Sequence, residues 1–467
     1  MTPSISTLAA LLRRRAPVFR AHPEQITFMS SPKQFFDAIL SEIDKAQQRI
    51  LLATLYFGNG ELEREMVSKL KNKLQNLPTE QFRMHAHMDY LRGTRDGPLN
   101  SSASLFKPLV DSFPSHLTVS LYRTPSLGWR QHFVPSRWNE VFGLSHMKFF
   151  VFDNTVIMTG ANLSSSYFTD RVDRYVCIKE HPELANYLQK LLKLVEMFSY
   201  KMNSNSLEKE MSFDASTRSS YDTDDFLKEL ELLFDVKNTF CDDEPPTDDA
   251  TFMIPTIQMA PHHVRQDEKS LEDLVSWFNE NLPSATCTLA SGYFNLSPLA
   301  QHIFSKAQNI RSPWRILTSS PRANSFFGSS GASRYIPDAY RSIEHAFLID
   351  QNKRPSLARN AAGEEVIYEY NRPNWTFHAK GLWMDDPNSG IAVTIIGSSN
   401  FGHRSFEKDL EAQLTIITSN ADLAAKMRHE REALFEYCIL VSAKDIEQEG
   451  MPSKTVQRAT AMIKSFL

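Results

Sequence analysis

Histidine, lysine and aspartate recur in this chain at one fixed spacing, in two places far apart. Both copies fit the pattern H-x-K-x-x-x-x-D, and their residues are His146, Lys148 and Asp153 in the first and His378, Lys380 and Asp385 in the second. Residues two apart in a strand point to the same face, so we expect each histidine to project beside its lysine. Two copies with matching spacing indicate a duplicated half-site rather than two unrelated strands that carry polar caps.

A histidine beside a lysine suits a pocket that handles phosphate. Imidazole can attack phosphorus or transfer a proton, and the compact ammonium offsets the charge of phosphate oxygens. Each copy is followed by an apolar run and a turn that contains an asparagine, Asn162 or Asn400. We expect both amides, and the hydroxyl of Ser398 in the second turn, to bind phosphate oxygens. Asp153 and Asp385 lie near strand ends, at positions whose side chains should point to the opposite face of the strand from the histidines. We therefore expect them to support the turns that complete the two catalytic motifs.

An acidic residue follows each asparagine at the same interval of 11 positions. Asp173 follows Asn162 and Glu411 follows Asn400, each at the start of a further apolar segment. A carboxylate on the second ring nitrogen of a histidine fixes its tautomer and orientation. We therefore predict that Asp173 and Glu411 orient the two histidines. The alternative is a pair of surface charges at strand ends.

The repeat extends to the elements that must position these residues. Residues 49–57 and 286–294 read as equivalent buried strands, with Tyr56 lying 90 positions before His146 and Tyr293 lying 85 before His378. Helical patterns flank both strands, at residues 33–48, 61–75, 269–281 and 298–307. Strands that alternate with helices predict an α/β fold in each half of the chain.

Length and composition are those of an ordinary globular protein. The chain has 467 residues, 42% of them hydrophobic and 23% charged, which is enough for two lobes with substantial cores. The net charge of −4 argues against a non-specific nucleic-acid binder, since such proteins are usually basic. The four cysteines form no C-x-x-C pair, and no Cys/His or carboxylate cluster has metal-ligand spacing. We expect no metal and no cofactor.

Composition suggests how the chain divides. Residues 204–261 include a stretch rich in Ser, Asp and Glu, which predicts a linker or mobile insert between lobes at 24–203 and 262–467, with a short helix near 225–234. Residues 1–23 contain four arginines and no acidic residue, a composition typical of a mitochondrial transit peptide. The alternative for that segment is a plain basic amphipathic helix. No apolar run reaches the roughly 18 residues needed to span a bilayer.

The doubled motif resembles the phospholipase D superfamily, whose members join two such half-sites into one active site. The surrounding sequence is similar to the eukaryotic phosphatidylglycerophosphate synthases in the blocks Leu144–Lys148, Thr159–Ser164, Tyr167–Tyr175, Asn374–Trp383, Phe401–Ser405 and Asp409–Ala412. This resemblance implies two α/β lobes related by a pseudo-two-fold axis, with the active site between them. One departure is that Thr159 and Gly160 stand where the second copy has Gly397 and Ser398, so the first turn lacks the serine hydroxyl.

The resemblance also implies a reaction. A phosphatidyltransferase of this family takes CDP-diacylglycerol and passes the phosphatidyl group to glycerol 3-phosphate, in the pathway to anionic phospholipids such as cardiolipin. It implies that His146 is the nucleophile and forms a phosphohistidine, while His378 is the general acid and then the base. It further implies a mitochondrial enzyme that works from the surface of the inner membrane.

Arginine side chains are candidates to bind the phosphate of the acceptor, because arginine can bind phosphate through two parallel hydrogen bonds. The candidates are Arg92, Arg95, Arg137, Arg171, Arg174 and Arg404. The alternative for each is a solvated or structural arginine. Phe326, Phe327 and Tyr335 could dip into a membrane beside the site or pack in the core.

Two other functions remain open from the sequence alone. The motif also occurs in other phosphodiester enzymes, such as phospholipases, cardiolipin-type synthases and nucleases. A catalytically silent membrane-surface scaffold of the same fold is the non-enzymatic alternative, and the two complete half-sites argue against it.

Overall fold

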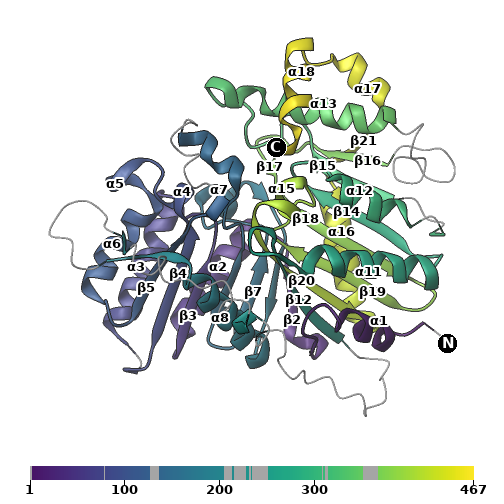
Figure 1. Cartoon of the computed structure of the whole chain (residues 1–467). Coiled ribbons are helices and arrows are strands. Elements are labelled where there is room, and N and C mark those ends of the chain that lie inside the picture. The colour runs from purple at the N-terminus through teal and green to yellow at the C-terminus, as the bar shows by residue number, and fades with distance from the viewer. Residues whose placement is uncertain are drawn as a thin grey trace.

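The computed structural model describes residues 3–77, 79–126, 136–203, 213–214, 228–230, 233, 251–307, 309–310, 314–350 and 366–466. Within these residues the chain forms two large sheets that lie side by side, each covered by helices (Figure 1). The first half of the chain builds one sheet and the second half builds most of the other. The predicted α/β fold with two related lobes is confirmed.

The two sheets share one strand order, β10-β5-β4-β3-β6-β7-β9-β2 in the first and β21-β16-β15-β14-β18-β19-β20-β12 in the second, while β11 extends the first sheet beyond β10 and β1 extends the second beyond β12. The strands of the first sheet are β2 (Ile26–Met29), β3 (Arg49–Ala53), β4 (Arg83–Asp89), β5 (Leu117–Tyr122), β6 (Phe149–Phe152), β7 (Thr155–Thr159), β9 (Tyr175–Ile178), β10 (Ser199–Met202) and β11 (Phe213–Asp214). The strands of the second sheet are β1 (Phe19–Arg20), β12 (Thr251–Met259), β13 (Val264–Arg265), β14 (Thr286–Ser291), β15 (Trp314–Ser319), β16 (Ile367–Tyr370), β18 (Lys380–Asp386), β19 (Ile391–Gly397), β20 (Leu410–Thr418) and β21 (Cys438–Val441). In both sheets three neighbouring strands are parallel, and the strand that follows the catalytic histidine joins them antiparallel.

The four helices predicted from periodicity are present. They are α2 (Pro32–Lys45), α3 (Glu61–Gln75), α11 (Gln266–Asn281) and α12 (Pro298–Ser305). Local sequence explains where two of these helices begin: Ser31 before α2 and Ser297 before α12 each accept a backbone hydrogen bond as N-caps, and a proline follows each serine. The other helices are α1 (Ile5–Leu12), α4 (Tyr90–Gly93), α5 (Gly97–Asn100), α6 (Ser102–Ser112), α7 (Ser165–Thr169), α8 (Pro182–Glu196), α13 (Ile336–Ile349), α15 (His403–Glu407), α16 (Ala421–Phe435), α17 (Ala443–Glu449) and α18 (Lys454–Ile463).

The two lobes share a core. Buried side chains of β6, such as Phe149 and Val151, belong to the same apolar cluster as Leu414 and Ile416 of β20. Each lobe also has a core of its own on the other side of its sheet. Because the middle cluster draws on both halves, the halves are held together by burial of apolar surface and not by a linker.

The predicted linker at residues 204–261 is wrong from Thr251 onward. Residues 251–259 form β12, which is buried along its whole length and pairs antiparallel with β20. This strand is the counterpart of β2, which pairs with β9 in the first lobe. The sequence contains the pattern of a buried strand there, but the polar stretch that precedes it drew the predicted boundary too far. The helix predicted near 225–234 lies largely outside the described residues.

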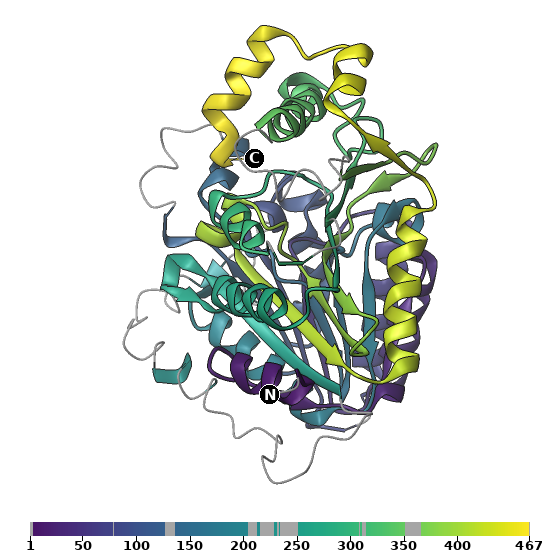
Figure 2. The same cartoon turned by 90° about the vertical axis from the view of Figure 1, so that its right-hand side faces the viewer.

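The structure builds the N-terminal segment into the fold, contrary to the expectation that residues 1–23 can be removed without loss of structure, while their role as a transit peptide stays a prediction. Helix α1 packs against α11 and buries Ile5, Leu8 and Leu12 in the core of the second lobe. Strand β1 then pairs with β12. Figures 1 and 2 show this N-terminal segment lying on the C-terminal lobe. The arginines gave the segment a targeting composition, whereas its leucines serve the fold.

Removing the buried face of α1 should destabilise the protein. Leu8 is fully buried, so Leu8→Ala should lower the free energy of unfolding by about 2–5 kcal/mol, as large-to-small core substitutions do. Arg14→Ala, at an exposed position just after the helix, is the matched control and should change it little. Urea unfolding of both variants measures the difference. Equal midpoints would show that α1 contributes no packing energy.

Candidate active site

Each histidine motif is anchored to the opposite half of the chain. The backbone N–H of His146, which lies just before β6, donates to the carbonyl of Leu410 at 2.8 Å. The backbone N–H of His378, just before β18, donates to the carbonyl of Val172 at 2.8 Å. In addition, β17 (Thr376–Phe377) pairs with β8 (Arg171–Val172). The two motifs therefore meet because each half holds the other's histidine segment.

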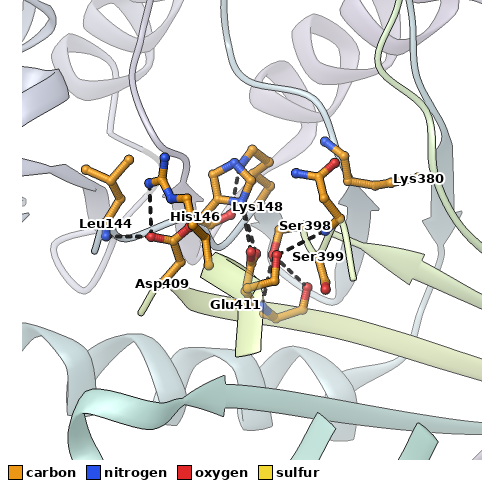
Figure 3. A network of polar contacts seen from close by, with 12 residues as sticks. Leu144, His146, Lys148, Lys380, Ser398, Ser399, Asp409 and Glu411 are labelled. Carbon is orange, nitrogen blue, oxygen red and sulfur yellow. Dashed lines mark hydrogen bonds and ion pairs between the residues drawn. The ribbon is translucent and has the colours of Figure 1, made fainter. Parts of the chain in front are cut away.

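The predicted carboxylate partners contact the histidines, and they do so across the halves. Nδ1 of His146 lies 3.1 and 3.0 Å from the two carboxylate oxygens of Glu411 (Figure 3). Nδ1 of His378 lies 2.6 Å from Oδ2 of Asp173. A carboxylate at Nδ1 leaves Nε2 of each ring for chemistry. Alignment of the two repeats predicted a carboxylate for each histidine, but it did not predict that each carboxylate comes from the opposite half.

The two lysines lie within the same buried network. Nζ of Lys148 donates to the carbonyl of His146 at 2.7 Å, and Nζ of Lys380 lies 3.0 Å from Nδ1 of His378. Burial lowers the pKa of Lys148 well below its ordinary value, and the nearby Lys380 ammonium lowers it further. Burial lowers the pKa of Lys380 to about 8, while the Asp173 and Glu411 carboxylates oppose that shift. Both ammonium groups thus lie where further negative charge would be favourable.

Burial and neighbouring cations lower the pKa of both histidines well below the usual range. For His146 burial is the largest cause, followed by the charges of Lys148 and Lys380. For His378 burial is again first, followed by Lys380 and Arg171. Burial conversely raises the pKa of Asp173 to about 6 and raises that of Glu411. Both imidazoles are therefore neutral near pH 7 when no anion is bound.

The histidines face one cavity of about 420 Å³ between the lobes. Asn162 and Asn400, the predicted phosphate-binding amides, line this cavity with them. Each leaves its buried Oδ1 without a hydrogen-bond partner within the described residues. Rotation of an amide by half a turn would present its NH₂ group instead. No group of three His, Cys, Asp or Glu side chains among the described residues is arranged to hold a metal ion.

Tyr167 is a site residue that the sequence analysis missed. Its hydroxyl lies 3.2 Å from Nε2 of His378 and 3.1 Å from Nδ2 of Asn162, which donates to it. Tyr167 follows Asn162 by five positions, as Ser405 follows Asn400, and both line the cavity. Extending the repeat alignment by five residues would have identified the pair. Three further tyrosines also line the cavity, namely Tyr56, Tyr293 and Tyr340.

Ser398 is buried behind the cavity rather than exposed to it, so the structure does not place it as a phosphate ligand. Its hydroxyl hydrogen-bonds with the backbone of Ala412 and helps to hold Glu411 (Figure 3). The equivalent residue of the first half is Gly160. A Cβ there would lie 2.5 Å from Oδ1 of Asp173, so the shorter, closer carboxylate explains why the first turn lacks a serine.

Four of the six candidate arginines line the cavity. They are Arg92, Arg95, Arg171 and Arg404. The prediction for Arg174 is wrong: its buried guanidinium forms two 2.8 Å hydrogen bonds to Glu430 and stacks over Trp383 at 3.7 Å. A side chain at Gly381 would overlap this guanidinium, which accounts for the glycine. The side chain of Arg137 lies outside the described part of the chain.

The aspartates of the two motifs lie away from the cavity and support the fold. Asp153 adopts a positive φ of 52° in the β6–β7 turn, and its carboxylate accepts from the backbone N–H groups of Gln47, Gln48 and Arg49. Asp385 accepts from Thr286 and pairs with Arg431. Among the residues that the structure describes, neither aspartate contacts a histidine or a lysine of its own motif, which agrees with a supporting role.

Asp89 connects the arginine side of the cavity to the first histidine segment. Its carboxylate caps α4 by accepting from the backbone N–H of Arg92 at 2.9 Å. The other oxygen accepts from the backbone N–H of Ser145 at 3.1 Å. Burial raises the pKa of Asp89 to about 7. One side chain thus fixes the position of Arg92 relative to His146.

Comparisons with known proteins agree with this fold. The sequence pattern of the family described as "Cardiolipin synthase, PLD-like domain" matches residues 282–435. The solved structure "Crystal structure of phosphatidylserine synthase Haemophilus influenzae Rd KW20" superposes over 100% of both chains with a TM-score of 0.74 and 18% identity, which supports the fold.

Curated relatives are similar over nearly the whole chain. A protein of Cricetulus griseus named "CDP-diacylglycerol–glycerol-3-phosphate 3-phosphatidyltransferase, mitochondrial" is 34% identical over 97% of this chain and 86% of its own length. The Homo sapiens protein of that name is 34% identical over 97% and 85%. A Saccharomyces pastorianus protein named "CDP-diacylglycerol–glycerol-3-phosphate 3-phosphatidyltransferase" is 32% identical over 96% and 88%. The chain therefore belongs to the phospholipase D-like family of CDP-diacylglycerol–glycerol-3-phosphate 3-phosphatidyltransferases.

Proposed function

We propose that this protein transfers a phosphatidyl group from CDP-diacylglycerol to glycerol 3-phosphate, releasing CMP and forming phosphatidylglycerophosphate. The observation that carries the proposal is the cavity itself. Two histidines, each held by a buried carboxylate, face one space that four arginines also line. Such a space suits two phosphate-bearing substrates, because arginine and lysine offset phosphate charge.

In the first step, Nε2 of His146 attacks the phosphorus that carries diacylglycerol. An N–P bond forms, the P–O bond to CMP breaks, and protonated His378 gives its proton to the leaving phosphate. In the second step, His378 takes the proton of a glycerol 3-phosphate hydroxyl. That oxygen attacks phosphorus, the N–P bond breaks, and His146 is regenerated. Lys148, Lys380 and the asparagine amides stabilise the charge on the phosphoryl oxygens.

The assignment of the nucleophile is supported by an asymmetry between the rings. Nε2 of His146 faces the cavity and has no hydrogen-bond partner within the described part of the chain. Nε2 of His378 lies 3.2 Å from the Tyr167 hydroxyl. An attacking nitrogen needs an accessible lone pair, whereas a group that shuttles protons can remain hydrogen-bonded.

Access from a membrane surface accords with side chains beside the cavity. Phe326 lines it, while Phe327 and Tyr335 are 60% and 44% exposed. Within the described residues, no helix has the length and apolar character required to cross a bilayer. We infer that the protein binds peripherally to the mitochondrial inner membrane, where fractionation of cells should find it. Recovery in another compartment would reject this location.

The reaction can be tested with purified protein. CMP release should require both CDP-diacylglycerol and glycerol 3-phosphate, and mass spectrometry should identify phosphatidylglycerophosphate as the lipid product. Glycerol, which lacks the phosphate that the arginines would bind, should be a poor acceptor. Phosphatidic acid as the main product in the presence of glycerol 3-phosphate would indicate a hydrolase instead.

The two histidines should behave differently when removed. His146→Ala should form no covalent intermediate with CDP-diacylglycerol. His378→Ala should form it slowly and accumulate it, because loss of a general acid or base typically costs about 10²- to 10⁴-fold and breakdown also needs the base. Mass spectrometry after an alkaline quench detects the acid-labile adduct, and His302→Ala, at an exposed position on α12, is the control. An adduct on His378 in the wild-type enzyme would reverse the assignment.

The pH dependence of the reaction rate should change when the cations beside each histidine are removed. Catalysis needs neutral His146 and protonated His378, so kcat/KM for CDP-diacylglycerol should be bell-shaped, with apparent pKa values that belong to the pair. Arg171 lowers the pKa of His378, and Arg404 lowers that of His146. Arg171→Gln should therefore move the alkaline limb to higher pH, and Arg404→Gln should move the acidic limb to higher pH. Identical shifts in both variants would contradict these separate couplings.

A further inference from the structure

An acidic side chain lies among the arginines at one side of the catalytic cavity. Glu140 lines the cavity with Arg92 and Arg95 from the first lobe and Arg404 from the second. The carboxylate contacts Nη2 of Arg95 closely and lies 3.5 Å from Nη1 of Arg92. Its main-chain carbonyl accepts from Nη2 of Arg404 at 3.1 Å. One residue thus contacts all three arginines of this cluster.

The cluster retains capacity for a further anion. Nε of Arg404 is buried and has no hydrogen-bond partner among the described residues. Its guanidinium also contacts Asp409 at 3.2 Å, so Glu140 and Asp409 together place two negative charges against three positive ones. A carboxylate and a phosphate present paired oxygens to arginine in a similar way. A phosphate monoester carries about −1.5 to −2 charge at pH 7, which exceeds the charge of one carboxylate.

We propose that Glu140 occupies the acceptor-phosphate subsite of the empty enzyme and must be displaced by the acceptor, so that it selects for a phosphate-bearing alcohol. The proposal rests on the proposed function and names the chemistry of the second substrate's site. Water and neutral alcohols offer no charge to compete with a tethered carboxylate for Arg92 and Arg95. Specificity of this kind arises from a group that disfavours wrong partners.

The arginines and the histidine are linked structurally, so displacement of Glu140 takes place beside the reacting group. Asp89 caps the helix of Arg92 and also holds Ser145, next to His146. Asp409 holds Arg404 and accepts from the backbone N–H of Leu144 at 2.9 Å (Figure 3). An acceptor phosphate on these arginines would therefore bring its hydroxyl end towards the cavity that holds the histidines.

Replacement of the carboxylate by an amide tests the proposal. Glu140→Gln keeps the shape of the side chain and removes its charge, so the KM for glycerol 3-phosphate should fall about tenfold, as for loss of one competing ion pair. Calorimetric titration with inorganic phosphate, without turnover, should show a similar gain in affinity. Glu272→Gln, which breaks a half-exposed ion pair with Lys306 outside the cavity, should change neither quantity.

A shorter acid gives a second readout. Glu140→Asp keeps the charge but withdraws it by one methylene, so its KM and phosphate affinity should lie between those of the wild type and Glu140→Gln. An unchanged or raised KM together with unchanged phosphate affinity in a folded Glu140→Gln protein would overturn the proposal. Failure of the proposed function would differ: the wild-type enzyme would release no CMP with glycerol 3-phosphate, whatever Glu140 does to phosphate binding.

Discussion

The exchange of carboxylates between the two halves is the constraint on which the active site depends. His146 is held by Glu411 and His378 by Asp173, so each half-site is completed by the other. A buried charge is costly unless a partner compensates it, and here the partners come from opposite lobes. Neither lobe alone can keep its histidine in one tautomer. The shared apolar core between β6 and β20 supplies the energy that holds these pairs in register.

The two halves have equivalent backbones but carry different side chains at some equivalent positions. Tyr167 occupies the position that Ser405 has in the second half, and Gly160 the position of Ser398. The first difference gives His378 a hydroxyl partner that His146 does not have within the described part of the chain. The second accommodates an aspartate on one side and a glutamate on the other. The proposed reaction needs one histidine with an accessible nitrogen and one histidine that transfers protons. The duplicated backbone provides two similar histidine sites, and the different side chains around them make the two sites unequal.

The repeat made the centre of the site predictable from sequence, because its spacing is local and occurs twice. His146, His378 and their carboxylates followed from intervals that the two halves share. Residues whose roles depend on distant partners could not be predicted in this way. The local sequence of α1 does not show that it packs against α11, and that of Arg174 does not show that it binds Glu430. The role of Glu140 could not be predicted from the sequence, because nothing in the neighbouring residues indicates that three arginines surround it.

The cations around the cavity favour binding of an anion and disfavour a protonated histidine. Burial and cations hold both histidines neutral, which suits the nucleophile but not the general acid. On the mechanism proposed above, a bound pyrophosphate would offset the charges of Lys380 and Arg171 and would itself favour the imidazolium, which would raise the pKa of His378. The same substrate that needs a proton for its leaving group thus creates the acid that provides it. In that mechanism, protonated His378 would be favoured when CDP-diacylglycerol is bound, and after giving its proton to the leaving CMP it would be the neutral base for the second step.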